Sequence, residues 1–229
     1  MKVLVFDTET TGLPQSRVIS QDTIHKWPHI VQFSYIIYDT ELNDITVSVD
    51  NIVKVSEGVD ITPESQLFHG ITNEMSQNSG KNMADLLKQF FYHLRESDIL
   101  VGHNVSFDIN MLKVELLRMI LQNENLTELK ENKFDLHYLT HYENVCCTMK
   151  ESVTICALEK KDKSGKSYNK FPKLTELHET LFKSTPNNLH NSFNDILVTL
   201  RCYVKLKYDV DLNNTCDTFI KCSRQIGLL

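Results

Sequence analysis

The feature that most constrains this chain is a stretch near its N-terminus in which an apolar run leads directly into two acidic residues. Residues 3–13 read VLVFDTETTGL. The valine-rich run predicts a short buried strand. Because residues i and i+2 of a strand project from the same face, Asp7 and Glu9 should lie side by side at or just past its carboxyl end.

Two adjacent carboxylates repel each other unless a cation or a proton lies between them. Mg²⁺ favours carboxylate and water oxygens, so the pair Asp7 and Glu9 is a candidate site for a hard divalent cation. Two solvated acids at an exposed strand end are the alternative. The pair alone does not decide between these interpretations, and the decision depends on residues further along the chain.

The composition is that of a globular protein with an ordinary core. The 229 residues fit one domain, and 41% of them are hydrophobic and 24% charged. A net charge of -6 argues against binding nucleic acid mainly through a broad basic surface, but not against meeting phosphates through a bound metal. The six cysteines form no Cys-x-x-Cys pair, which predicts reduced thiols.

We expect a soluble, intracellular protein, in the cytoplasm or nucleus. The N-terminus enters a strand directly, without the charged leader and apolar core of a signal peptide. No apolar run approaches the roughly 20 residues of a membrane span, so no membrane association is predicted.

The hydrophobic pattern predicts a three-strand antiparallel meander followed by helices alternating with a strand. The expected strands cover residues 2–6, 30–39, 44–55 and 99–101, and the expected helices cover residues 82–96, 106–121, 174–182 and the apolar stretch through 196–204. Residues 14–29 and 61–72 are expected to be loops, and residues 122–150 are polar and poorly periodic. This order predicts an α/β protein with a mixed sheet flanked by helices.

A second acidic motif follows the predicted strand at residues 99–101, where residues 101–108 read VGHNVSFD. Asp108 falls in the first turn of the next helix. The helix dipole stabilises an acid there whatever its function, so Asp108 is either an N-terminal charge or a carboxylate aimed back at the sheet. Phe107 beside it either stacks on a base or fills the core.

The third motif pairs His190 with Asp195 at the entrance to the last long apolar helix. In one regular helix, residues five apart point roughly 140° away from each other. The two side chains converge more easily if His190 lies just before the helix and Asp195 one turn inside it. Taken alone, this pair indicates little.

Together the three motifs resemble those of the DnaQ-like DEDDh family of 3′–5′ exonucleases, which belongs to the ribonuclease H-like superfamily. Shorter segments also match: WPHIVQF at 27–33, HGIT at 69–72 and PKLTEL at 172–177. The resemblance covers residues 1–207, the expected exonuclease domain, and leaves 208–229 as a C-terminal helix or tail of the same domain. Asn191 stands where the tyrosine subclass carries its tyrosine, which indicates the histidine subclass.

The resemblance implies a ribonuclease H-like fold and the release of nucleoside 5′-monophosphates from 3′ ends. The metal-binding carboxylates that it implies are Asp7, Glu9, Asp108 and Asp195, with His190 as the general base. The implied cofactor is a pair of Mg²⁺ ions, for which Mn²⁺ would substitute. This agrees with the chemistry, because two metals about 3.5–4 Å apart activate water and neutralise the leaving oxygen of a phosphodiester. A neutral histidine, with a reference pKa of about 6.5, accepts the water's proton near neutral pH.

The resemblance also implies that Thr10 and Leu13 contact the terminal nucleotide. His103, Asn104 and Phe107 are further candidates for this pocket, each with an alternative role in turn formation or packing. The segment 160–173, which carries six lysines, is either a solvated loop or a basic arm near a phosphate chain.

The expected partner is a nucleic acid with a free 3′ end. Single-stranded DNA is favoured, and RNA or short oligoribonucleotides are the alternative, because metal and phosphate contacts serve both sugars. A non-catalytic accessory that binds nucleic acid is least favoured, since all four carboxylates are present. The chain is too short for a polymerase domain, so a replicative role would require a polymerase in a separate chain.

Overall fold

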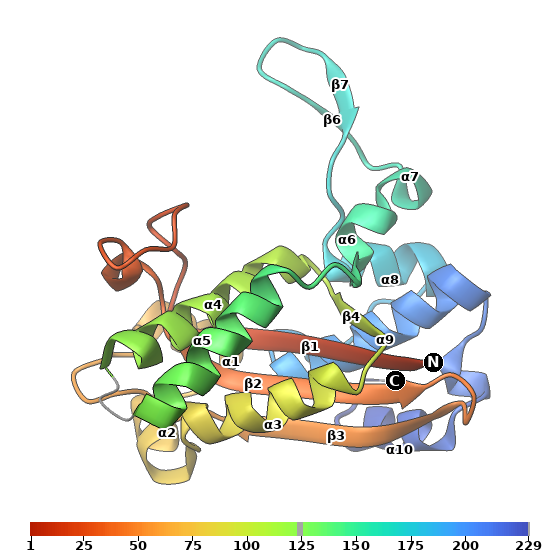
Figure 1. The fold of residues 1–229 in the computed structure, drawn as a ribbon. Helices are drawn as coiled ribbons and strands as arrows, with labels where there is room; N and C mark the ends of the chain where they lie inside the picture. Colours follow the sequence, from red (N-terminus) through yellow and green to blue (C-terminus); the bar gives the residue numbers. More distant parts are fainter. Residues whose placement is uncertain (123–125, 229) are drawn as a thin grey trace.

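The computed structural model describes residues 1–122 and 126–228, and these residues form a five-stranded mixed sheet as the centre of the fold (Figure 1). The strands are β1 (Lys2–Thr10), β2 (Ile30–Asp39), β3 (Asp44–Ile52), β4 (Ile99–Gly102) and β5 (Val145–Cys147). Their order is β3-β2-β1-β4-β5, with β1, β2 and β3 antiparallel and with β4 and β5 parallel to β1. The predicted α/β mixed sheet, a meander extended by parallel strands, is confirmed.

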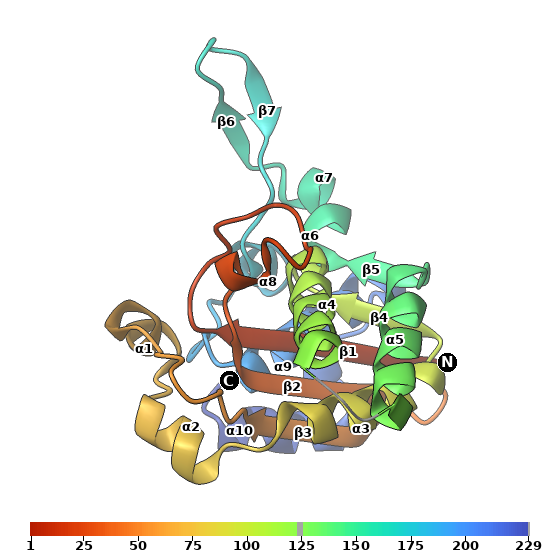
Figure 2. The ribbon, with the colours of Figure 1, turned by 60° about the vertical axis from the view of Figure 1, so that its left-hand side comes forward.

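Helices cover both faces of the sheet (Figures 1 and 2). One layer consists of α3 (Met83–Arg95), α4 (Val105–Gln122) and α5 (Leu126–Thr140), and the other of α9 (Ser192–Tyr208) and α10 (Asp217–Gln225), with α8 (Leu174–Phe182) beside α9. The alternation of β1 explains this arrangement. Leu4 and Phe6 belong to the core cluster of the first layer, and Val3 and Val5 to that of the second.

The long amphipathic helices form where the pattern predicts them. In α3 the Asn82 side chain accepts a hydrogen bond of 2.8 Å from the Ala84 N–H, which caps the helix. Its buried stripe consists of Met83, Leu86, Leu87, Phe90, Phe91 and Leu94. The predicted helices at 82–96, 106–121 and 174–182 are confirmed to within a residue at each end.

Three segments contain more regular structure than the sequence predicts. The expected loop at 61–72 contains α1 (Pro63–His69) and runs into α2 (Asn73–Ser79). The stretch 122–150, of which 123–125 lie outside the described residues, holds α5, β5 and α6 (Thr148–Glu151). The lysine-rich segment contains most of a hairpin formed by β6 (Glu159–Lys161) and β7 (Ser167–Asn169). The remaining elements are η1 (Ile24–Lys26), α7 (Val153–Cys156) and η2 (Leu212–Asn214).

Two strand ends also differ from the prediction. β1 continues to Thr10, so Asp7 and Glu9 lie within the strand rather than past its end, and β3 stops at Ile52. β1 is extended because β2 pairs with it along its whole length, with one irregularity between Glu9 and Thr10. Both acids are therefore held by a hydrogen-bonded ladder.

Two further features concern the cysteines and the C-terminal segment. All six cysteines are free thiols. The C-terminal segment, apart from Leu229, which is not described, ends in α10, and Phe219 of this helix lies in the same core cluster as Val3 and Val5. Across 1–122 and 126–228, no helix is both long and apolar enough to cross a membrane.

Candidate active site

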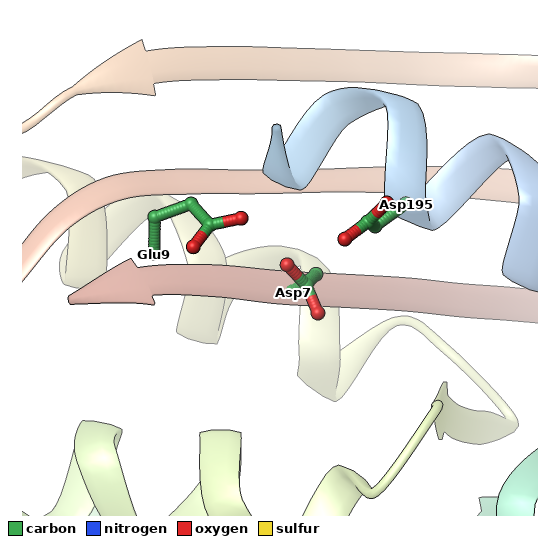
Figure 3. Close-up of side chains that lie close together, drawn as sticks. All are labelled: Asp7, Glu9 and Asp195. Atoms are coloured by element: carbon green, nitrogen blue, oxygen red, sulfur yellow. The ribbon is translucent and has the colours of Figure 1, made fainter. Parts of the chain in front are cut away.

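Three carboxylates meet on the face of β1 that α9 covers (Figure 3). Asp7 and Glu9 continue the alternation of Val3 and Val5, so they point toward α9. Asp195, in the first turn of α9, points back toward them. One oxygen from each of the three carboxylates lies within 4.8 Å of the other two. We call Asp7, Glu9 and Asp195 the carboxylate cluster.

Hydrogen bonds from β2 fix the start of α9 above this cluster. The Ser192 N–H donates to Gln32 Oε1 at 3.1 Å, and the Ser192 and Ser34 hydroxyls are 2.5 Å apart. Gln32 and Ser34 are the register partners of Glu9 and Asp7 on β1. The residues opposite the two acids therefore hold the helix that carries the third.

The same anchor continues into β3. Asp50 Oδ1 accepts hydrogen bonds from Gln32 Nε2 at 2.8 Å and from the Ser34 hydroxyl at 2.7 Å. Because Ser34 donates to Asp50, the Ser192 hydroxyl donates to Ser34. Ser34 and Ser192 are fully buried, where an unsatisfied hydroxyl would be costly, so the network holds the helix in one position.

His190 lies just before α9, as the sequence predicts for convergence with Asp195. The Asn191 side chain caps the helix by accepting from the Phe193 and Asn194 N–H groups at 3.1 and 3.3 Å. His190 precedes this cap with a φ of 69°, in the left-handed region. Its side chain is exposed, and its ring packs edge-on against Phe68 with the centroids 5.6 Å apart.

Asp108 approaches β1 from the opposite face and is not a member of the carboxylate cluster within the described chain. Its Oδ1 accepts from the Thr8 N–H at 3.0 Å and from the Thr8 hydroxyl at 2.7 Å. Thr8 alternates with Asp7 and Glu9, so it faces the layer that contains α4. The expected role of Asp108 as a metal ligand stays a prediction.

The electrostatics of the four acids oppose ionisation. Burial raises the pKa of Asp7 well above its ordinary value, and the charges of Asp108, Asp195 and Glu9 add to this effect. Burial, with Asp195 and Asp108, raises the pKa of Glu9 to about 8. Burial raises the pKa of Asp195 to about 7, although a hydrogen bond from the His190 backbone N–H acts to lower it. Burial also raises the pKa of Asp108 to about 7, although the hydrogen bonds from Thr8 act to lower it.

These properties fit a divalent cation. Asp195 Oδ1 is buried and has no hydrogen-bond partner among the described residues. Buried polar atoms almost always have partners, so an unpartnered oxygen on a carboxylate that lies beside two others indicates a place for a positive charge. Oxygen donors of this kind suit Mg²⁺ or Mn²⁺. The carboxylate cluster could therefore bind a metal ion.

The expected nucleotide contacts differ in how available they are. Leu13, in the turn after β1, is 81% exposed, and Asn104 is exposed with a φ of 64°. Thr10 is buried, and its hydroxyl donates to the Gly12 carbonyl at 2.7 Å, which supports the turn. Phe107 packs partly against the core.

His103 is a structural junction in this geometry. Its Nε2 donates to the Pro172 carbonyl, 3.1 Å away, and its Nδ1 lies 2.9 Å from the Thr148 hydroxyl. Burial lowers the pKa of His103 to about 4, although the hydrogen bond to the Pro172 carbonyl acts to raise it. The ring is therefore neutral at physiological pH. A neutral ring with Nε2–H leaves Nδ1 to accept from Thr148. Both ring nitrogens thus have partners within the protein.

Phe68 was not among the predicted site residues, because residues 61–72 lack a helical period. The Ser65 hydroxyl donates to the Thr11 carbonyl at 2.8 Å, which ties α1 to the turn after β1. Phe68, 68% exposed, then faces His190. A signal was available, since Thr62 before Pro63 is a typical helix start and Gly70, with a φ of 75°, a typical stop.

The mixed sheet with its two helical layers defines a domain with a ribonuclease H-like fold, and the carboxylate cluster lies between this sheet and α9. Residues 4–203 match the family model described as "Exonuclease". The chain therefore belongs to this exonuclease family, of the DnaQ-like type.

Individual relatives agree with this assignment. The chain is 31% identical over 118 residues to the DNA polymerase III subunit epsilon of Buchnera aphidicola subsp. Acyrthosiphon pisum (strain APS), an alignment that covers 50% of this chain and 44% of the relative. A moderately thermophilic exonuclease I from Methylocaldum szegediense superposes over 93% of this chain and 42% of its own, with a TM-score of 0.58 and 21% identity. E. coli exonuclease I in complex with a dA16 oligonucleotide superposes over 91% and 41%, with a TM-score of 0.57 and 17% identity.

These coverages mean that the chain spans less than half the length of each of these relatives. At 17–21% identity, the solved structures establish a shared fold.

Proposed function

We propose that this protein is a metal-dependent 3′–5′ exonuclease that hydrolyses the terminal phosphodiester bond and releases nucleoside 5′-monophosphates. The observation that carries the proposal is the carboxylate cluster, with its three converging oxygens and the unpartnered Asp195 Oδ1. Exonuclease family membership gives this cluster its chemical context.

Asp7, Glu9 and Asp195 would hold the divalent cation, with Asp108 on the other face of β1 contributing negative charge. We propose two ions, Mg²⁺ or Mn²⁺, because four carboxylates balance their charge. When bound, such ions activate a water molecule and neutralise charge on the leaving oxygen. The protein's own contribution is to fix the acids on a paired strand and a tethered helix, so that no rearrangement is needed when the substrate binds.

His190 is the proposed general base. It is exposed at the entrance to α9, five residues before Asp195, and its imidazole would accept the proton of the attacking water. The contact with Phe68 holds the ring on the side of α1 in the present arrangement.

Leu13 and Phe68 are the proposed apolar contacts for the terminal nucleoside, because both are exposed on segments that Ser65 and Thr11 tie together. Contacts to the face of a base do not read its edges, so we expect little sequence preference. Thr10 and Asn104 remain candidates for polar contacts, while His103 and Phe107 would support the pocket from behind.

Single-stranded DNA is the proposed substrate, with RNA as the alternative. The support is the solved structure of E. coli exonuclease I with a DNA oligonucleotide and the similarity to a DNA polymerase III subunit. The similarity to a DNA polymerase III subunit also favours a polymerase in a separate chain as a partner. A non-catalytic accessory role is disfavoured because the acids converge into a cluster.

A timed digestion tests both direction and sugar. Single-stranded DNA and RNA of one sequence, each labelled at the 5′ end, are incubated with Mg²⁺, Mn²⁺ or EDTA. We expect a ladder shortened from the 3′ end that disappears with EDTA, faster for DNA. Immediate release of the 5′-terminal nucleotide, internal cuts or activity in EDTA would refute the proposal.

The role of His190 is tested in the same assay. His190→Ala should lower the rate by about 10²–10⁴-fold, the usual contribution of a general base, while leaving Mn²⁺ binding intact. Full activity of this variant would exclude His190 as the base.

A further inference from the structure

The β6–β7 hairpin stands away from the rest of the molecule in both views (Figures 1 and 2). We call residues 159–169 the basic hairpin. Its tip is a closed turn in which Asp162 accepts hydrogen bonds from the Ser164 N–H, the Ser164 hydroxyl and the Lys166 N–H at 2.8, 2.6 and 3.0 Å. Gly165 supplies the left-handed residue, with a φ of 85°. The hairpin is thus a defined element.

Its charge is opposite to that of the whole molecule. Residues 159–169 contain four lysines against two acids, a local charge of +2 in a chain with a net charge of -6. Asp162 is engaged in the turn, and Lys170 pairs with Glu176 at the base. Within the described residues, four exposed lysines of the hairpin have no ion-pair partner: Lys160, Lys161, Lys163 and Lys166.

One face of the hairpin combines a cation with an aromatic ring. Lys160 of β6 and Tyr168 of β7 are directly opposite in the antiparallel register, so their side chains share a face. Tyr168 is 48% exposed. An ammonium group beside an exposed ring is the combination that binds single-stranded nucleic acid, with a phosphate on the former and a stacked base on the latter.

The base of the hairpin is joined to the edge of the sheet that carries the catalytic acids. β4 runs parallel to β1, with Val101 paired to Val5, and His103 lies in the turn between β4 and α4. His103 bonds to Thr148, on the chain that leads into the hairpin, and to Pro172, on the chain that leaves it. The base of the hairpin is therefore anchored to the turn after β4, the strand next to β1.

We propose that the basic hairpin binds the single strand on the 5′ side of the nucleotide being removed. Its lysines contact phosphates, and Tyr168 stacks on an unpaired base. This inference rests on the proposed function, since it assigns a position to the rest of the strand whose 3′ end lies at the carboxylate cluster. The hairpin lysines attract the phosphates of the strand, which the net negative charge of the protein does not. Binding should depend on strand length, because only a longer strand reaches the hairpin.

A binding measurement in EDTA tests the hairpin without requiring catalysis. The probe is a fluorescent single-stranded DNA of about 20 nucleotides, and the readout is anisotropy at several salt concentrations. Substituting all four lysines by serine should weaken binding and lower the slope of log K against log[salt] by up to about 2.8, since each contact contributes about 0.7. Tyr168→Ala should weaken binding about fivefold or more with the slope unchanged.

The matched control replaces four exposed lysines elsewhere, Lys2, Lys88, Lys130 and Lys133, by serine. It changes the net charge equally, so a similar loss in both variants would mean that only overall charge matters and would overturn the proposal. Unchanged binding by the hairpin variant would overturn it as well, and thermal melting establishes that each variant is folded.

Hydrolysis of a short oligonucleotide separates this inference from the proposed function. A substrate of two or three nucleotides reaches the carboxylate cluster but not the hairpin. Wild type and hairpin variant should cleave it equally with Mg²⁺, and only the wild type should gain from a longer strand. A wild type without nuclease activity would refute the proposed function, whereas an equal gain from length in both would refute the role of the hairpin.

Discussion

The four acids on and beside β1, Asp7, Glu9, Asp108 and Asp195, all have raised pKa values. Glu9, with a pKa of about 8, and Asp195, with a pKa of about 7, retain protons that the same residues would lose near pH 4 in the unfolded chain. From about pH 4.5 to 8 the native state therefore binds more protons than the unfolded state. The free energy of unfolding of the metal-free protein must fall as the pH rises through this window.

The first prediction follows from this linkage. Thermal melts in EDTA should show declining stability between pH 5 and 8.5, and saturating Mn²⁺ should restore it by an amount that grows with pH, because the metal then displaces fewer protons. Glu9→Gln should flatten the decline, whereas the exposed control Glu57→Gln should leave it unchanged. Stability independent of Mn²⁺ at every pH would contradict the metal site.

The second prediction concerns Phe68, which contacts His190 and is 68% exposed. If it supports the terminal nucleoside, Phe68→Ala should raise KM by about fivefold or more, the lower range for loss of one base-stacking contact, while Phe68→Tyr retains most of the affinity. Phe134→Ala, an exposed aromatic of α5, is the control. Equal KM values for the wild type and Phe68→Ala would remove Phe68 from the pocket.

At the scale of elements, the site depends on how α9 is seated on the sheet. Asp195 reaches Asp7 and Glu9 because Ser192 is fastened to β2, opposite those acids. Since neither Ser34 nor Ser192 is exposed to solvent, their hydroxyls bond to each other and to protein groups and do not exchange these bonds for bonds to water.

The third prediction tests this contact by a double-mutant cycle. Ser34→Ala and Ser192→Ala should each cost about 1–3 kcal/mol of unfolding free energy, measured by urea denaturation, because each leaves a buried partner short of a hydrogen bond. The double variant should lose less than the sum of the two. Strict additivity would mean that the two hydroxyls do not act on each other.

Elements with long regular patterns were predictable, and short ones were not. β2 has 7 apolar or aromatic residues among its 10, and α3 repeats its apolar stripe over 13 residues, so both were found from pattern alone. α1 and α2 have 7 residues each and β5 has 3, too few to establish a period. α5 is polar along most of its length and packs through few residues, among them Leu139.

At the scale of the whole molecule, convergence of the site follows from topology. The spacing of Asp7, Glu9, Asp108 and Asp195 along the chain identified them as candidates, together with the resemblance to a nuclease family. Spacing could not show that Asp108 would meet Thr8 on the far face of β1, because this depends on which helical layer α4 joins. Nor could it show that His103 joins both ends of the segment that bears the basic hairpin.

The distribution of charged side chains also follows from the topology of the fold. The acidic side chains gather where β1 meets α9, and four lysines without ion-pair partners among the described residues stand on the β6–β7 hairpin, which projects from the rest of the molecule (Figure 1). The hairpin follows β1 by more than 140 residues, and His103, in the turn after the neighbouring strand β4, bonds to both segments that flank it. In the proposed binding mode, the hairpin lysines bind the phosphates of the strand, and only its 3′ end reaches the carboxylate cluster.

The most direct test of the account compares the wild type with Asp195→Asn in the 3′-end digestion of single-stranded DNA with Mg²⁺. The substitution keeps the size of the side chain but removes the negative charge of a carboxylate whose Oδ1 has no hydrogen-bond partner among the described residues. We predict that it reduces cleavage to the level seen in EDTA, while the fold, followed by circular dichroism, is unchanged. Cleavage by Asp195→Asn at the wild-type rate would contradict a metal-dependent site at the carboxylate cluster.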